Sequence, residues 1–235
     1  MQPLSRVSPN AEVIFGRNED MASRPEVAVK ISQCIAEWAD IESMLGMLLA
    51  ILLDGDQDAA LAMYSGVENR SSQMKMLESA ARIKIPEKID LFTVLMGSVI
   101  RPAMRERDRL AHWCWGFSPN LADALLLIQI HSKMAVHLKA VSPPNPVQLD
   151  FTKIFVVTAN DLGRTFARLQ TAKNYLADFI GTIWTLNPPE TRDRVLHSLC
   201  SKPEIRAALD RLIASRNKNS ESPPQSPPPD QSDEK

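Results

Sequence analysis

One short segment of the chain gathers the residue types that proton transfer and phosphate binding require. Residues 105–112 read RERDRLAH, which places three arginines, two carboxylates and a histidine within eight positions. An imidazole titrates near neutral pH and can take up or release a proton during a reaction. Guanidinium groups form paired hydrogen bonds with phosphate oxygens. This combination predicts chemistry on a phosphodiester, with Arg107, Asp108 and His112 as the catalytic candidates.

The reaction that these residues permit is RNA cleavage without a metal ion, in which the ribose 2′-hydroxyl attacks the adjacent phosphorus. His112 would transfer the proton, while Arg107 and Arg105 would hold the phosphate and balance the charge that develops on its oxygens. Arg101 shares a helical face with Arg105 and is a further candidate for phosphate binding. The four histidines have no ligand spacing with cysteines or carboxylates, so no metal or other cofactor is expected.

Helical phase divides this group into two sides. At about 100° per residue, Asp108 and Arg105 share a face with His112, so Asp108 is expected to orient the imidazole. Arg107 lies almost opposite, inside the apolar stripe of the same helix. A straight helix is therefore not expected to bring Arg107 to His112. They would meet if the helix ended before His112, or if two copies of the chain packed side by side.

The spacing of Arg107, Asp108 and His112 resembles the signature of the HEPN family of helical-bundle proteins. That signature is an arginine, usually followed by Asn, Asp or His, and then a histidine near the end of a long helix. The resemblance covers roughly residues 25–185, and Trp113 stands where the family usually has glycine. It implies a homodimeric ribonuclease that acts on RNA in a toxin or phage-defence setting, with an antitoxin or a nucleotidyltransferase as a further partner.

The same residues also have structural interpretations. Arg107 could close a buried ion pair with Glu42, which occupies the matching place in the apolar stripe of the first long helix. His112 could interact only with the last carbonyls of its helix. One alternative function is therefore a catalytically inactive, dimeric HEPN-like module that binds RNA, a nucleotide or another protein. Another is a helical scaffold whose proline-rich tail is a ligand for a partner.

The elements that must position the segment are mainly helices. Ser23 to Glu26 form a capping box with proline in the first turn, and the apolar helical repeat that follows ends near Gly55. A short helix is expected over 56–65, and Pro102 is expected to kink or break the helix that carries the motif. Four long helices are expected to form one bundle, over residues 25–54, 71–84, 86–112 and 161–185.

After Gly116 the chain changes to short apolar runs separated by turn residues, which predicts a small antiparallel sheet. The expected fold class is therefore mainly α, a HEPN-like four-helix bundle with a small antiparallel β insertion. The expected strands cover residues 124–130, 135–141 and 153–158. The expected organisation is an irregular N-terminal arm over 1–22, a bundle domain over 23–185 with the insertion at about 120–158, C-terminal helices over 186–216, and a disordered, Pro- and Ser-rich acidic tail over 217–235.

Composition limits the classes of function. The chain of 235 residues is 44% hydrophobic with a net charge of −1, so RNA binding must depend on a local basic surface. The N-terminus has no apolar signal core, and the longest apolar run, from Met44 to Leu53, is shorter than the roughly 20 residues of a membrane span. The three cysteines lie far apart in apolar settings, as expected of buried thiols. We therefore expect a cytoplasmic protein with no membrane contact.

Overall fold

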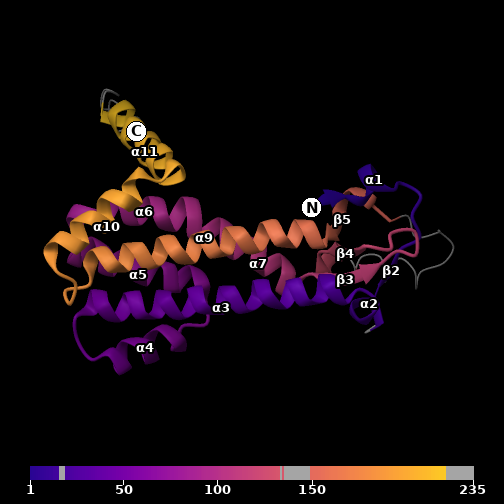
Figure 1. Cartoon of the computed structure of the whole chain (residues 1–235), viewed down its shortest axis with the longest axis horizontal. Coiled ribbons are helices and arrows are strands. Elements are labelled where there is room, and N and C mark those ends of the chain that lie inside the picture. The colour runs from indigo at the N-terminus through magenta and orange to yellow at the C-terminus, as the bar shows by residue number, and fades with distance from the viewer. Residues whose placement is uncertain (16–18, 133, 135–148, 221–235) are drawn as a thin grey trace, which may run out of the picture.

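The computed structural model describes residues 1–15, 19–132, 134 and 149–220 (Figure 1). Long helices lie side by side, and a small antiparallel sheet lies at one end of them (Figure 1). The expectation of a mainly α fold with a small antiparallel sheet is confirmed. No helix in the described ranges combines the length and the apolar character needed to cross a membrane.

The longest helix, α3 (Pro25–Leu53), begins and ends close to where its sequence indicates. Pro25 lies in its first turn, and Asp54 ends it in a left-handed conformation with φ of 49°. The capping box expected at the start of the helix is not formed. The N-cap is Arg24, whose guanidinium instead donates hydrogen bonds to the carbonyls of Ser118 and Leu121, so the helix start is joined to the loop after β3 (Cys114–Phe117).

The remaining long helices also follow the apolar repeats. The helix α9 begins with a capping box in which Thr158 and Asp161 bond each other's backbone amides. The helix α11 extends to Ser220, beyond the expected end of the C-terminal helices at residue 216, and residues 221–235 of the tail lie outside the described residues. The longer helices besides α3 and the motif region are α4 (Gln57–Gly66), α5 (Arg70–Lys84), α9 (Ala159–Ile183), α10 (Pro189–Ser201) and α11 (Pro203–Ser220).

The motif region is a continuous helical path with one widened turn. Pro102 was expected to kink or break it, but Pro102 lies in the first turn of α7, directly after a π turn. In that turn the Arg101 amide donates to the Met96 carbonyl, five residues back. The wider turn makes room for the proline ring, which would otherwise clash with a carbonyl of the preceding turn. The path consists of η1 (Pro86–Lys88), α6 (Ile89–Leu95), η2 (Met96–Ile100) and α7 (Arg101–His112).

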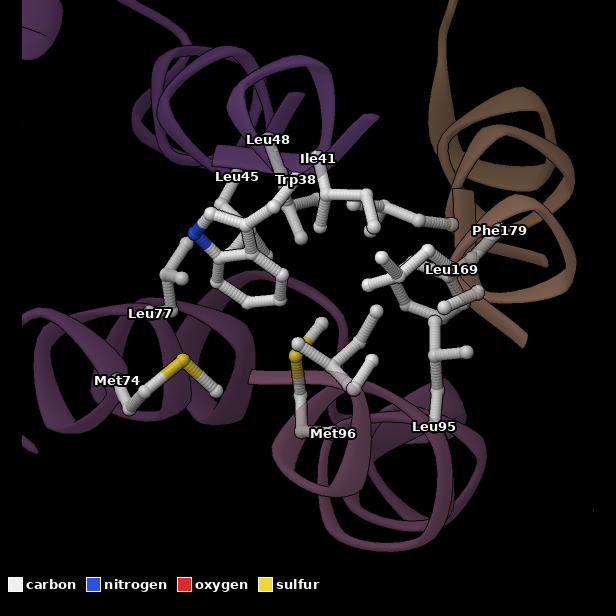
Figure 2. Packing of buried hydrophobic residues seen from close by; sticks show 14 of the residues in the cluster. Trp38, Ile41, Leu45, Leu48, Met74, Leu77, Leu95, Met96, Leu169 and Phe179 are labelled. Carbon is white, nitrogen blue, oxygen red and sulfur yellow. The ribbon is translucent and has the colours of Figure 1, made fainter. Parts of the chain in front are cut away.

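The main core lies between α3 and the helices that surround it. The helix α3 packs against α4, α5, α7 and α9, and α6 packs against α5 and α9. Figure 2 shows apolar side chains of α3, α5, α9 and the motif path directed into the space between these helices, among them Trp38, which is 1% exposed. Their burial from water is the main stabilising contribution to the fold. The labelled residues in that view are Trp38, Ile41, Leu45 and Leu48 of α3, Met74 and Leu77 of α5, Leu95 and Met96 of the motif path, and Leu169 and Phe179 of α9.

The sheet includes more of the chain than the sequence predicted. Its order is β1-β5-β4-β3-β2, and all neighbours are antiparallel. The N-terminal arm, expected to be irregular, supplies both edge strands and the short helices α1 (Leu4–Val7) and α2 (Glu19–Ala22). The expected strand over 135–141 lies outside the described residues. The strands are β1 (Gln2–Pro3), β2 (Ile14–Phe15), β3 (Cys114–Phe117), β4 (Ala124–Ile128) and β5 (Ile154–Thr158).

Candidate active site

The motif lies at the junction between the helices and the sheet, where α7 ends at His112 and β3 begins two residues later (Figure 1). Trp113 leaves the helix in an extended conformation, with φ of −85° and ψ of 157°. Any L-residue adopts this conformation, so the chain does not need glycine here. The Trp113 ring packs against Phe155 of β5 at 5.8 Å, and Trp115 Nε1 donates to the Leu110 carbonyl. These contacts fix the end of the helix.

Arg107 and His112 meet within a single chain. The distance from Arg107 Nη1 to His112 Nε2 is 3.4 Å, although helical phase predicted that a straight helix would keep them apart. The helix does not end before His112, and no second copy is needed. The long arginine side chain closes the distance instead, because its guanidinium reaches well beyond the backbone position that the phase describes. His112 itself is exposed.

Asp108 does not occupy the place expected for it. The sequence predicted that it would orient His112, but its Oδ1 accepts a hydrogen bond from Arg107 Nη1 at 3.2 Å. The same oxygen lies 3.9 Å from Nη1 of Arg70, a residue of α5. The group that touches the imidazole is therefore a guanidinium, and the carboxylate holds that guanidinium from the other side.

The predicted ion pair between Glu42 and Arg107 is wrong. Glu42 Oε1 lies 3.3 Å from Arg70 Nη2, and the Glu42 side chain is 35% exposed rather than buried. The Arg70 guanidinium lies over the Trp38 ring, 5.6 Å from its centre. Arg70 therefore stands between the two helices whose stripes suggested the pair. The sequence gives one sign of where Arg70 lies in the fold. Asn69 is a good helix N-cap, which makes Arg70 the first residue of α5.

These contacts form a row of alternating charges, Glu42–Arg70–Asp108–Arg107, which ends at His112. We call these five residues the ionic cluster. It begins on α3, passes through α5 and ends at the exposed imidazole of α7. The Arg107 side chain is 17% exposed, and its Nε is buried without a hydrogen-bond partner among the described residues. Beside the cluster, burial and the negative charge of Glu42 raise the pKa of Tyr64 to about 12, so its phenol stays protonated at neutral pH.

The two further phosphate candidates, Arg105 and Arg101, lie outside this cluster. Both are exposed, and neither side chain forms a hydrogen bond or ion pair with the described residues. Arg101 lies about 16 Å from His112 along the helix axis, so it cannot contact the same phosphate. Arg109 is also exposed, and its guanidinium lies 5.7 Å from the centre of the Trp113 ring. Arg101, Arg105 and Arg109 form an exposed stripe of positive charge that leads to His112.

Nowhere in the described ranges do three or more His, Cys, Asp or Glu side chains gather in a way that could hold a metal ion. Comparisons with models of known protein families, with the curated proteins and with solved structures find no match for this chain. The resemblance to the HEPN family therefore stays a hypothesis that experiments on the ionic cluster can test.

Proposed function

We propose that this protein is a HEPN-like, metal-independent endoribonuclease that acts in a toxin or phage-defence setting. The observation that carries the proposal is the 3.4 Å contact between Arg107 Nη1 and His112 Nε2 at the exposed end of α7. It puts a proton-transfer group and a phosphate-binding group side by side within one chain.

In the proposed reaction, His112 accepts the proton of a ribose 2′-hydroxyl while the oxygen attacks the adjacent phosphorus. The bond between phosphorus and the 5′ oxygen breaks, and that oxygen takes a proton from solvent. Arg107 meets the negative charge that develops on the phosphate oxygens. The products are a 2′,3′-cyclic phosphate and a 5′-hydroxyl end. Arg105 and Arg101 would contact neighbouring phosphates of the same RNA.

The arrangement of the helices supports the family part of the proposal. The helices α3, α5 and α9 and the path from α6 to α7 share one core, which is compatible with a HEPN-like four-helix bundle extended by α4, α10, α11 and the sheet. A homodimer and an antitoxin or nucleotidyltransferase partner follow from the resemblance alone. The contact between Arg107 and His112 does not need the dimer.

The test compares wild type with His112→Ala on single-stranded RNA and transfer RNA. We expect wild type to cleave in the presence of a chelator and to leave 2′,3′-cyclic phosphate ends. His112→Ala should keep its fold, because an exposed side chain contributes little packing, and should lose about 10²- to 10⁴-fold in rate. His197→Ala is the matched control, since His197 is an exposed histidine of α10, and it should cleave like wild type. Undiminished cleavage by His112→Ala would contradict the assignment.

A second function has its own support. The exposed arginines of α7 that lead to His112 provide a local basic surface on a chain whose net charge is −1. An RNA- or nucleotide-binding module without catalysis would use the same surface. Purified wild type that binds RNA but leaves it intact, with and without added metal, would favour this function over the ribonuclease.

A further inference from the structure

The ionic cluster contains a second guanidinium besides that of Arg107, which belongs to Arg70. The Nη1 atoms of Arg70 and Arg107 both face Oδ1 of Asp108, at 3.9 and 3.2 Å. Arg70 belongs to α5 and Arg107 to α7, so two separate helices direct cationic groups at one carboxylate oxygen. A phosphodiester carries the same single negative charge as that carboxylate and offers oxygens to both guanidinium groups.

Arg70 is held in place before any ligand binds. Its Nη2 lies 3.3 Å from Glu42 Oε1, and its guanidinium rests over the buried Trp38 ring. Its backbone is fixed by the cap at Asn69, whose side chain accepts hydrogen bonds from the amides of residues 71 and 72. A cation held in this way loses little conformational freedom when it binds an anion, which favours affinity.

The two terminal nitrogens of Arg70 have different neighbours, with Nη2 near Glu42 and Nη1 near Asp108. A distance of 3.9 Å is too long for a hydrogen bond, so Arg70 Nη1 attracts the Asp108 carboxylate without bonding to it. The Arg70 side chain is 27% exposed and the Asp108 side chain 37%, so solvent reaches this part of the cluster. An anion that displaces Asp108 would gain the unused donors of Arg70 and those of Arg107 that now bind the carboxylate.

We propose that Arg70 and Arg107 together bind the scissile phosphate of RNA, and that Asp108 occupies this two-arginine site until RNA displaces it. The inference rests on the proposed function for its substrate. It assigns Arg70 a direct contact with RNA, in place of a purely structural tie between α3 and α7.

The decisive probe is a fluorescent oligoribonucleotide with 2′-O-methyl groups, which lacks the attacking hydroxyl and cannot be cleaved. Its affinity is measured over a range of salt concentrations for wild type, Arg70→Gln, Arg70→Lys and Arg82→Gln. Each phosphate contact contributes about 0.7 to the slope of log affinity against log salt for a single strand. Arg82→Gln is the matched control, since Arg82 is an exposed arginine of α5 that pairs with Glu78.

We expect Arg70→Gln to weaken binding by about tenfold or more and to reduce the salt slope by about 0.7. Arg70→Lys should restore the slope, because the charge returns, but only part of the affinity, because the paired donors do not. Arg82→Gln should leave both quantities unchanged. If Arg70→Gln keeps the salt slope of wild type, the inference is overturned, whatever happens to its thermal stability.

Glu42→Gln is a second variant that leaves Arg70 in place, and it decides the matter if Arg70→Gln does not fold. Loss of the Glu42 charge makes the two-arginine site more positive, so RNA should bind about two- to fivefold more tightly. If Arg70 only ties α3 to α7, Glu42→Gln should lower thermal stability without tightening RNA binding, which would overturn the inference.

The two proposals fail in different ways. Wild type that binds the uncleavable RNA but never cleaves its natural counterpart refutes the ribonuclease. The salt slopes then still test whether Arg70 contacts an RNA phosphate. Wild type that cleaves, together with an Arg70→Gln slope equal to that of wild type, refutes only the role of Arg70. Wild type that does not bind RNA at all refutes both.

Discussion

One nitrogen of Arg107 serves two neighbours at once. Its Nη1 lies 3.2 Å from Asp108 Oδ1 and 3.4 Å from His112 Nε2. A guanidinium stays protonated and has no acceptor, so it donates in both directions. His112 Nε2 is then the accepting nitrogen, and the neutral imidazole carries its proton on Nδ1. In the proposed reaction, RNA would have to draw Arg107 away from Nε2 before that nitrogen could accept a proton, which would couple phosphate binding to activation of the base.

The planar shape of the Arg107 guanidinium should therefore affect the rate of RNA cleavage as much as its charge does. Arg107→Lys keeps a positive charge but cannot bond two neighbours in one plane. We expect kcat/KM for RNA cleavage to fall about 10²-fold, with a circular dichroism spectrum like that of wild type. Arg109→Lys is the control on the exposed side of the same helix and should change the rate little. An Arg107→Lys enzyme with full activity would show that charge alone is sufficient.

Cys34 should be chemically silent in the folded protein. Burial, and then the negative charge of Glu106, raise the pKa of its thiol to about 11, and its Sγ faces the Leu162 carbonyl. The thiolate is the reactive form, so very little of it is present at pH 8. Iodoacetamide at that pH should leave Cys34 unmodified in the folded protein and modify it in urea, as peptide mass spectrometry can measure. Rapid labelling without denaturant would mean that α3 opens locally from the core.

The start of α9 is held by several hydrogen bonds to the Asp161 carboxylate. Burial acts to raise the pKa of the Asp161 carboxyl, but hydrogen bonds from the Met1 amino group, from the Thr158 amide and hydroxyl, and from Arg164 outweigh it. They lower that pKa to about 2. Because the folded value is below the unfolded value of about 3.9, Asp161 stabilises the fold above pH 4. The contribution is lost as the pH falls toward 2.

Asp161→Asn should consequently lower the free energy of unfolding at pH 7 by roughly 1 to 2 kcal/mol. The difference between wild type and variant should shrink as the pH falls from 4 to 2, because wild type then loses the same charge. Urea unfolding at pH 7, 4 and 2 measures this. Asp150→Asn, at the exposed cap of η3 (Phe151–Lys153), is the control and should show a smaller change at every pH. A difference that stays constant with pH would point to packing instead.

The long helices could be predicted because their apolar residues recur at a fixed spacing. The apolar stripe of α3 runs for many turns, so its bounds of 25–53 differ from the expected 25–54 by one residue. The edge strands β1 and β2 could not be predicted, since two residues contain no alternation. At the site, residue types located Arg107 and His112, whereas the Asn69 cap indicates only where α5 begins and not that Arg70 faces Asp108. The packing of α5 against Trp38 sets the direction of that side chain, and such contacts between distant segments leave no sequence pattern.

At the scale of the whole molecule, the residues of the proposed site come from one chain. Glu42, Arg70, Asp108, Arg107 and His112 come from three helices of the same copy. A site shared between two copies would instead lose activity whenever the copies separate. In the proposed reaction the chemistry therefore does not depend on the oligomeric state, even if two copies associate through another surface.

Specific cleavage activity should therefore stay constant as the protein is diluted, at concentrations both above and below those at which light scattering detects a dimer. Mixing His112→Ala with Arg107→Lys should not restore activity, because each chain lacks one member of its own pair. Each variant alone serves as the reference for the mixture. Recovery of activity on mixing would mean that one copy supplies the arginine and the other the histidine.

The π turn at η2 sets the rotational position of everything that follows it. It contains one residue more than a regular turn would need, and a residue corresponds to about 100° of rotation in an α-helix. Arg107, Asp108 and His112 all lie on α7, so the turn sets which neighbouring helix they face, and at this angle Asp108 faces Arg70 of α5. Gly97, exposed and surrounded by open space, lies in that turn. The direction in which α7 presents the motif thus depends on a turn ten residues before Arg107, among side chains that carry no charge. An insertion or deletion there would turn Asp108 away from Arg70 and leave the contact between Arg107 and His112 within α7, so the motif alone does not identify a chain in which a second arginine lies beside it.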